Sequence, residues 1–383
     1  MISTQTIVDD SASAKPAQFE LDAVTASRTG RRTFIKSALS TAAALSLGAM
    51  SCSPDYHTRD YAGPWTKKAD LPTPRFDLSI GVIDNKLYAL GGYDWDGHRT
   101  FSSAEVYDAN EDRWYMLQDM SYSRRNCGVG VLDKRLYVVG GLGEPRNDKE
   151  RWGYLSSLEM YEPDSDSWIE RRPMPTPRDR IGVAAVDGKL YVAGGFFWSR
   201  STAETYPDGP RTYFKYALKT LEVYDPQTDT WERRKDMPKP STVSGAAAID
   251  GKLYIVRNAS TIKIQTMDGC ELNWLSELFV YDPEKDGWTR IGDVPTPRAD
   301  VAVADVNKEL YLIGGSPIPA KVEAYNTQTG MWSDEPSLRF PRSRHAAGVI
   351  KDTIYVLGGC FVRPMIPPWR VIVIPSVEAY TVS

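Results

Sequence analysis

The sequence predicts an all-β fold, a six-bladed β-propeller with four-stranded antiparallel blades. Three observations lead to this prediction. One residue pattern recurs six times between Trp65 and Tyr380 with fixed internal spacing, each copy can form four short strands, and the variation in length falls in one connection of each copy. Repeats of this kind bury their apolar faces only by stacking on one another, as the blades of a propeller do.

Each copy carries aromatic residues at constant separations. A tyrosine is followed seven residues later by a tryptophan, and ten residues after the tryptophan comes an arginine. A second tyrosine lies thirteen residues further on and precedes a Gly-Gly pair by three residues. The tryptophans of this set are Trp65, Trp114, Trp168, Trp231, Trp288 and Trp332, and the arginines are Arg75, Arg124, Arg178, Arg298 and Arg342.

Apolar runs separated by turn residues predict the four strands of a copy. In the third copy, Asp187-Gly188 separates the runs 181–186 and 189–195, which is typical of a hairpin. A third run ends at Tyr224, and a fourth strand carries Trp231 after a turn-forming stretch. The first run of each copy is rich in Gly and Ala, as expected of the innermost strand, where side chains have least room.

The two ends of the repeat region complement each other. Tyr380 lies three residues before the last residue, Ser383, so the final copy lacks its tryptophan, whereas Trp65 has no tyrosine before it. We therefore expect the N-terminal strand to complete the last blade and to close the ring. Closure would leave no free sheet edge open to aggregation.

These motifs resemble the kelch repeat. Its hallmarks are the Gly-Gly pair, the spaced Tyr and Trp, and a Val-Glu-x-Tyr-Asp-Pro strand, present here at 221–226 and, more loosely, at 104–108. The resemblance covers about residues 64–383 and implies a kelch-repeat propeller of a bacterial, exported protein. It implies no single function, because kelch propellers include scaffolds, sugar-processing enzymes and oxidases.

The fourth copy departs from the pattern at several positions at once. Ser241 replaces the arginine, Phe279 replaces a recurring glutamate, and Arg257-Asn258 replaces the Gly-Gly pair. The simultaneous loss indicates that the arginine and the glutamate are partners, because removal of one alone would leave a buried charge unpaired. The glutamates of the other copies are Glu105, Glu159, Glu222, Glu323 and Glu378.

The N-terminal residues 1–51 contain no copy of the repeat and resemble a twin-arginine signal peptide. Arg31-Arg32 precedes a mild apolar run at 37–50; the alternative is a disordered basic tail. Cleavage just before Cys52 is expected, by ordinary signal peptidase or, with Cys52 lipidated, by the lipoprotein enzyme. Residues 52–63 then form a polar tether, and we expect a periplasmic or cell-envelope protein whose one link to a membrane is that lipid.

Composition narrows the range of partners. The net charge is -4, and the repeat region has no Lys/Arg run, which argues against nucleic acid. The other cysteines, Cys127, Cys270 and Cys360, are odd in number and widely spaced, so no disulfide framework is implied. We expect a monomer without a cofactor.

The loop face of the propeller is predicted to be aromatic. Connections from the second to the third strand share one face with the links between blades. Five tryptophans outside the structural set fall one each in the five longer connections: Trp95, Trp152, Trp198, Trp274 and Trp369. Clustered aromatics of this kind bind glycans or proteins; the alternative is that they hold long loops against the blades.

A second group of candidates lies eleven residues before the second tyrosine of each copy. Its members are Asp77, Asn126, Arg180, Val243, Asp300 and Arg344. We expect Arg180 and Arg344 to donate to an anion or hydroxyl, Asp77 and Asp300 to accept, and Asn126 to contact the ligand; the alternative is local salt bridges. In kelch proteins that bind acidic peptides, the position matching Arg180 contacts the ligand, which the resemblance extends to this chain.

Two functions remain open from the sequence. The first is an exported binding module that recognises an extracytoplasmic glycan or protein. The alternative is a carbohydrate-modifying enzyme, similar to the exported six-bladed kelch mutarotases or epimerases of sialic acid or to a lyase, with Asp77, Arg180, Asp300, Arg344 and His345 as catalytic candidates. His98 and His345 are weak candidates for metal ligands. Kelch copper oxidases usually have seven blades, which argues against a copper site in a six-bladed propeller.

Overall fold

The computed structural model describes residues 63–145, 153–197, 217–265, 269–316, 320–363 and 370–382, and all regular elements in these ranges are β-strands. The described residues do not include the predicted signal peptide 1–51, residues 52–62 of the predicted tether 52–63, or the proposed lipidation site Cys52. Within the described ranges there is no helix long and apolar enough to cross a membrane.

The described strands form six four-stranded antiparallel sheets, numbered here by the order of their innermost strands. The first sheet contains β2 (Ser79–Ile83), β3 (Lys86–Leu90), β6 (Ala104–Asp108) and β7 (Arg113–Met116). The second contains β9 (Gly128–Leu132), β10 (Arg135–Val139), β13 (Leu158–Glu162) and β14 (Ser167–Arg171). The third contains β15 (Gly182–Val186), β16 (Lys189–Ala193), β17 (Leu221–Asp225) and β18 (Thr230–Arg234).

The remaining sheets follow the same order from the inside outward. The fourth contains β19 (Thr242–Ile249), β20 (Lys252–Gln265), β21 (Gly269–Asp282) and β22 (Gly287–Asp293). The fifth contains β23 (Ala302–Val306), β24 (Glu309–Ile313), β25 (Val322–Asn326) and β26 (Met331–Glu335). The sixth contains β27 (Ala346–Ile350), β28 (Thr353–Leu357), β31 (Val377–Thr381) and β1 (Thr66–Lys68).

Short strands in the connections complete the list. β4 (Tyr93–Asp94) pairs with β5 (Arg99–Thr100), and β29 (Cys360–Arg363) pairs with β30 (Arg370–Val373). A three-stranded sheet contains β8 (Tyr122–Arg125), β11 (Leu142–Pro145) and β12 (Gly153–Tyr154).

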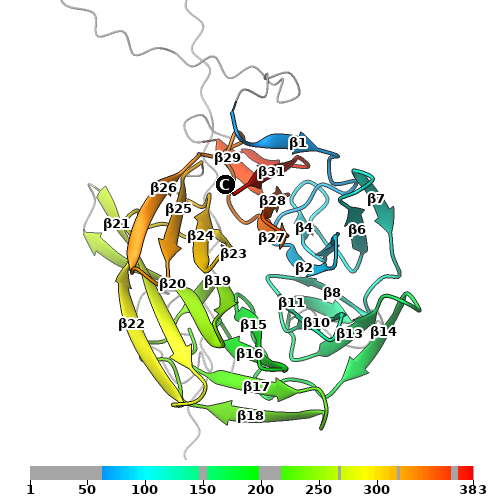
Figure 1. Ribbon diagram of the computed structural model, residues 1–383, viewed down its shortest axis with the longest axis horizontal. Helices are drawn as coiled ribbons and strands as arrows, with labels where there is room; N and C mark the ends of the chain where they lie inside the picture. Colours follow the sequence, from blue (N-terminus) through cyan, green and yellow to red (C-terminus); the bar gives the residue numbers. More distant parts are fainter. Residues whose placement is uncertain are drawn as a thin grey trace, which may run out of the picture. The chain divides into compact units, whose positions relative to one another are not determined.

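The six sheets lie around a common axis (Figure 1). Their innermost strands contact one another in the order β2, β9, β15, β19, β23, β27, and β27 contacts β2 again. β1 pairs antiparallel with β31, with Thr66 opposite Ala379, which is the pairing expected from the missing tryptophan of the last copy. Each hydrophobic cluster is shared by neighbouring sheets; one contains Leu87 and Tyr107 of the first sheet together with Tyr355 of the sixth.

The Gly-Gly pairs are required by the backbone at the end of the second strand. Gly91 and Gly92 have φ of 60° and 102°, in a region that residues with a Cβ rarely adopt. A Cβ on Gly91 would meet the carbonyl oxygen of Arg124 at 2.2 Å, because the next repeat approaches closely there. The glycines therefore end the second strand and turn the chain into the variable connection.

The fourth sheet lacks the Gly-Gly pair, and its second strand does not end at that position. Arg257 and Asn258 stay in β20, which continues to Gln265 and pairs with β21 as far as Gly269. The expected loop after Asn258 is thus a two-stranded ribbon. Trp274, predicted to lie in a loop, lies in β21 opposite Ser260, and the loop prediction for it was wrong.

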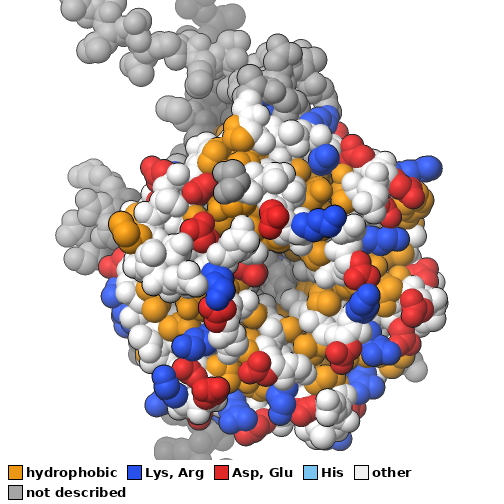
Figure 2. Space-filling view, viewed as in Figure 1, with side chains coloured by type: hydrophobic (Ala, Val, Ile, Leu, Met, Phe, Trp, Pro, Cys, Tyr) orange, Lys and Arg blue, Asp and Glu red, His pale blue; other side chains and the backbone are white. Residues whose placement is uncertain are grey.

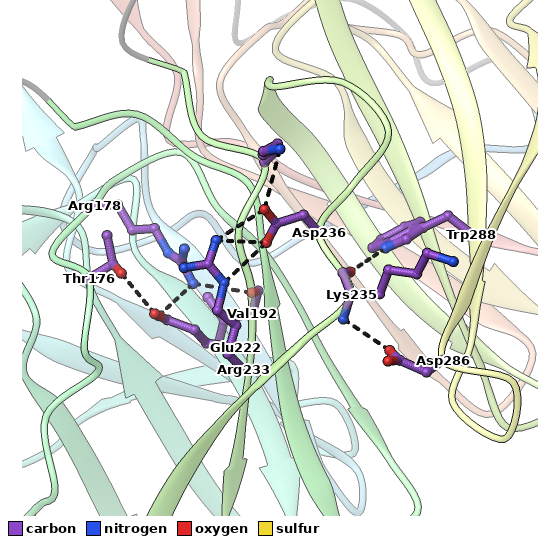
Figure 3. Close-up of polar contacts among 10 residues, drawn as sticks. Thr176, Arg178, Val192, Glu222, Arg233, Lys235, Asp236, Asp286 and Trp288 are labelled. Carbon is purple, nitrogen blue, oxygen red and sulfur yellow. Dashed lines mark hydrogen bonds and ion pairs between the residues drawn. The ribbon is translucent and has the colours of Figure 1, made fainter.

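The predicted arginine-glutamate partners are confirmed. Arg178 Nη2 donates to Glu222 Oε2 at 3.0 Å and to the Val192 carbonyl oxygen at 3.2 Å (Figure 3). Both side chains are at most 4% exposed. Four other repeats form the same buried pair: Arg75 with Glu105, Arg124 with Glu159, Arg298 with Glu323, and Arg342 with Glu378.

The spaced tyrosine and tryptophan join neighbouring sheets. Trp288 Nε1 donates to the Lys235 carbonyl oxygen at 2.8 Å, while the Lys235 N–H donates to Asp286 Oδ1 at 2.9 Å (Figure 3). The same Asp286 oxygen accepts from the Tyr281 hydroxyl at 2.6 Å. Trp114, Trp168 and Trp231 make equivalent bonds to Ala69, Gln118 and Arg172, so this set of tryptophans is structural.

Candidate functional site

Two consecutive positions of the repeat converge on one cavity at the end of the central axis. The first supplies the mixed polar set that the sequence singled out: Asp77, Asn126, Arg180, Val243, Asp300 and Arg344. The next residue of each repeat lies beside it: Leu78, Cys127, Ile181, Ser244, Val301 and His345. With Ser79 and Asn258 these residues line a cavity of about 160 Å³, which we call the mouth pocket. Figure 2 shows a hollow at the centre of the ring of sheets.

The backbone fixes the first set of residues as a belt. At five of these six described positions, all but Asp300, the backbone N–H donates to the carbonyl oxygen of the equivalent residue in the preceding sheet, as from Asn126 to Asp77 at 2.9 Å and from Arg180 to Asn126 at 3.0 Å. The N–H of Asp77 donates to Arg344 at 2.9 Å, which links the first sheet to the sixth. The belt therefore holds residues far apart in sequence at one level of the axis.

The belt imposes an unusual conformation. Asp77, Asn126, Arg180, Asp300 and Arg344 have φ between 52° and 58°. Asp and Asn tolerate this left-handed region, but arginine is uncommon there. Strained positions that persist in a cavity are candidates for function.

Two members of the belt form an ion pair. Arg344 Nε donates to Asp77 Oδ1 at 2.7 Å, and Nη2 of the same guanidinium contacts Oδ2. The pair is largely buried, with side-chain exposures of 26% for Arg344 and 3% for Asp77. Asn126 Nδ2 lies 3.4 Å from Asp77 Oδ2. For Arg344 and Asp77 the structure thus shows the local salt bridge that the sequence left open as the alternative.

Arg180 and Asp300 are less engaged. The side chain of Arg180 is 47% exposed, and its nearest ionic partner is Asp179, whose Oδ2 lies 3.9 Å from Nε. Asp300 is partly exposed and lies near Arg344. Burial lowers the pKa of Arg344, but the negative charges of Asp77 and Asp300 outweigh this effect and raise it. Arg180 is therefore the belt cation that is best placed to meet an incoming anion.

Asp179 is a candidate that the sequence did not reveal. The residue is 3% exposed, and its Oδ1 has no hydrogen-bond partner. Burial raises its pKa to about 7, while Arg180 opposes the rise and Asp77 adds to it. A carboxyl group that titrates near neutrality beside an exposed guanidinium can donate or accept a proton.

The two histidines lie in different surroundings. His345 lines the mouth pocket and is 6% exposed, and neither ring nitrogen makes a hydrogen bond of normal geometry. Burial lowers the pKa of His345 well below its usual value, and Arg342 lowers it further, although the Ile313 backbone favours the charged form slightly. His98 is exposed in the turn between β4 and β5, where its Nδ1 lies 3.1 Å from the Tyr93 hydroxyl, and it does not line the pocket.

The described ranges therefore do not place His98 and His345 together as metal ligands. The described part of the chain also contains no cluster of three or more His, Cys, Asp or Glu side chains spaced to hold a metal. Cys127 and Cys360 are buried free thiols.

The structure describes part of the expected aromatic face. Trp95 is 43% exposed, with its ring 6.4 Å from that of Tyr93 in an edge-on arrangement. Tyr154 contacts Phe196 and Phe197 in the neighbouring connection, with ring centroids 5.8 Å and 5.6 Å away. Trp152, Trp198 and Trp369 lie outside the described residues, as does the side chain of Trp274.

Comparisons with known proteins agree with this architecture. Kelch-like protein 35 of Mus musculus is 24% identical over 73% of this chain and 50% of its own length. Kelch-like protein 25 of Xenopus tropicalis is 24% identical over 81% of this chain and 41% of its own, and Kelch-like protein terF of Aspergillus terreus is 27% identical over 48% and 39%. The chain thus spans half or less of the length of these relatives.

The solved structure of YjhT is similar to this chain in fold, with a TM-score of 0.61 at 18% identity, covering 81% of this chain and 96% of that one. A family model described as the KLHDC2/KLHL20/DRC7 Kelch-repeats domain matches residues 82–315, more than half of the sequence. The chain therefore belongs to this family of kelch-repeat domains.

Proposed function

We propose that this chain is a binding module, a closed six-bladed kelch propeller that holds an acidic group of an extracytoplasmic glycan or protein in the mouth pocket. The observation that carries the proposal is the state of Arg180. Its side chain is half exposed at the pocket, its backbone is held in the belt, and its guanidinium is only loosely paired with Asp179.

The rest of the pocket favours an anion at this position. The charges of Arg344 and Asp77 offset each other in their ion pair, so neither is available without breaking it. Arginine presents several donors in a planar arrangement that matches a carboxylate. The exposed ring of Trp95 and its neighbour Tyr93 add apolar surface on a connection of the first sheet, and Trp152, Trp198, Trp274 and Trp369 are proposed to extend it.

The proposal includes the location of the protein. The twin-arginine motif, the apolar run after it and Cys52 support export to the periplasm or cell envelope, with a lipid on Cys52 as the one membrane attachment. A monomer is proposed, with no nucleic-acid partner. Replacing Arg31 and Arg32 by lysine should retain the protein in the cytoplasm, and cell fractionation would contradict export if the location stayed the same.

Binding through Arg180 can be tested on the full-length protein. Arg180→Ala should weaken binding of D-glucuronate or of an acidic peptide at least tenfold in an NMR titration, because a charged hydrogen bond is lost. Arg172→Ala, which removes an exposed arginine just after the outermost strand of the second sheet, is the matched control and should leave the affinity unchanged. Equal affinities for the wild type and Arg180→Ala would refute the proposal.

A second function is supported by one specific observation. The Asp179 carboxyl, with its pKa near 7, lies beside Arg180 as an acid or base would beside a group that holds the substrate. A carbohydrate-modifying enzyme of the mutarotase, epimerase or lyase kind needs such a group, and Asp300 and His345 remain catalytic candidates. NMR exchange measurements between sugar anomers test this function, because Asp179→Asn should then abolish exchange while leaving sugar binding in place.

A further inference from the structure

Two departures of the fourth repeat, Ser241 and Asn258, are hydrogen-bonded to each other beside the mouth pocket. Ser241 replaces the repeat arginine, and its hydroxyl donates to the Asn258 carbonyl oxygen at 2.5 Å. Asn258 replaces the second glycine of the pair, and its Oδ1 accepts from the Ser244 hydroxyl at 2.5 Å. Ser244 and Asn258 both line the pocket. Substitutions scattered along the sequence thus form one connected group in space.

A bulge in β19 brings Ser244 to the pocket. The register of β19 with β20 shifts between Val243 and Gly245, so Ser244 is the extra residue. Val243 is the belt residue of this sheet, and it lacks the positive φ of the other five. Bulges of this kind redirect a side chain, and here the apolar belt residue is accompanied by a hydroxyl group.

Asn258 adds a side chain where the other repeats have none. The equivalent residues are glycines with φ between 95° and 105°: Gly92, Gly141, Gly195, Gly315 and Gly359. The amide oxygen of Asn258 is engaged by Ser244, while its amino group makes no hydrogen bond with another described residue. That amino group is an available donor at the pocket wall.

New ion pairs in the fourth sheet take the place of the arginine-glutamate pair found in the other repeats. Arg257, at the position of the first glycine, lies opposite Glu277 in the ladder and forms an ion pair with it. Glu277 is 2% exposed in its side chain and also accepts from Arg290 at 3.0 Å and Lys239 at 3.2 Å. A buried carboxylate with three cationic partners replaces the arginine-glutamate pair of the other repeats, as expected of a sheet that retains its stability.

We propose that Ser244 and Asn258 are specificity determinants, which bind an uncharged oxygen of the ligand whose acid group is held by Arg180, and that the ligand is an acidic sugar. This inference rests on the proposed function for its anion site. Five uncharged hydrogen-bonding side chains line the pocket: Ser79, Asn126, Ser244, Asn258 and His345. Such a set suits the hydroxyl groups of a sugar.

The size and floor of the pocket agree with this ligand class. A cavity of about 160 Å³ is smaller than the pockets that enclose drug-sized ligands, which measure roughly 300 to 1,000 Å³, so it suits a single sugar residue. Leu78, Ile181 and Val301 supply apolar surface for its C–H groups. An acidic side chain of a peptide carries a carboxylate for Arg180 but no hydroxyl group to accept from the Asn258 amino group.

A pair of acids separates the two contributions in NMR titrations of the full-length protein. D-Glucuronate and cyclohexanecarboxylate both carry a carboxylate on a six-membered ring, but only the first has hydroxyl groups. Asn258→Gly restores the residue of the other repeats, and it should weaken glucuronate binding roughly fivefold to tenfold, the worth of one neutral hydrogen bond. It should leave cyclohexanecarboxylate unchanged, whereas Arg180→Ala should weaken both acids.

The outcomes distinguish the two proposals. If Asn258→Gly does not fold, as judged by its melting temperature, Ser244→Ala replaces it. An equal effect of Asn258→Gly on both acids, or no effect on either, overturns the inference, as does an acidic peptide whose binding Asn258→Gly weakens as much as that of glucuronate. If Arg180→Ala changes neither acid while Asn258→Gly still weakens glucuronate, the anion site of the proposed function falls and the role of Asn258 stands. If the wild type binds neither acid nor methyl glucoside, the inference is overturned.

Discussion

Arg344 Nε donates to Asp77 Oδ1 at 2.7 Å across 267 positions of sequence, and this bond joins the sixth sheet to the first. The guanidinium carbon also lies 4.5 Å from the centre of the Phe76 ring. The first and sixth sheets are therefore linked at the mouth pocket both by side chains and by the backbone belt. The pairing of β1 with β31 is a separate contact, at the outer strands of the sixth sheet.

Asp77→Asn should destabilise the protein. The variant keeps the shape of the side chain and the left-handed backbone, which Asn tolerates, but it leaves the largely buried Arg344 without its counter-charge. We expect the free energy of unfolding in urea to fall by about 2 to 4 kcal/mol. Asp300→Asn is the matched control at an equivalent belt position with no such pair, and its cost should stay below about 1 kcal/mol. Similar losses for both variants would contradict the role given to the ion pair.

Glu159→Gln should be more costly than a surface substitution of the same type. Glu159 is fully buried, pairs with Arg124, and accepts from the Ser121 N–H at 2.7 Å. Loss of its charge leaves a buried arginine uncompensated, at a cost of about 3 to 5 kcal/mol. Glu111→Gln, on the surface beside Tyr115, provides the control in the same urea titration. The structural role of the repeat pairs is refuted if Glu159→Gln unfolds at the wild-type midpoint.

Asp286→Ala tests the connection between neighbouring sheets. The variant removes the acceptor for the Tyr281 hydroxyl and for the Lys235 N–H, and it places alanine at a φ of 42°. Two lost hydrogen bonds and an unfavourable backbone position should lower stability by about 2 to 3 kcal/mol. Differential scanning calorimetry measures the effect, and Glu284→Ala in the same turn should leave the melting temperature almost unchanged.

Asp179 should make stability depend on pH. Its pKa rises from 3.8 to about 7 on folding, so between these values the folded state holds a proton that the unfolded state has released. Stability from this group is therefore present below pH 3.8, is lost as the pH rises toward 7, and is level above 7. Asp179→Asn should match the wild type at pH 4 and exceed it at pH 8 by up to about 4 kcal/mol. A constant difference between the two proteins from pH 4 to 8 would contradict the raised pKa.

Much of the fold can be predicted from the spacing of the repeat. Trp288 and Tyr281 occur at fixed separations because each must reach the same groups in the neighbouring sheet, so their recurrence predicts the strand order. The joint departure of Ser241 and Phe279 from the pattern identifies the arginine-glutamate pair for the same physical reason. Equivalence between repeats also places Arg180 at the axis, because its N–H donates to the carbonyl oxygen of Asn126 and its own carbonyl oxygen accepts from the N–H of Val243, the belt residues on either side.

Features that belong to one repeat alone were harder to predict. Asp179 comes directly after the repeat arginine, at a position that holds a different residue type in each of the six copies, so its burial has no sequence pattern. The pairing of Arg344 with Asp77 depends on which belt residues become neighbours when the ring is assembled. The ribbon after Asn258 could have been predicted from the absence of the Gly-Gly pair. Without glycines to form a left-handed turn, β20 continues past Asn258 and pairs with β21.

A crystal structure of the protein with bound D-glucuronate tests the central claim most directly, that the belt presents Arg180 to an acidic ligand in the mouth pocket. The account predicts the carboxylate within hydrogen-bonding distance of the Arg180 guanidinium, with the sugar ring over Leu78 and Ile181. Glucuronate bound elsewhere with the mouth pocket empty would contradict it.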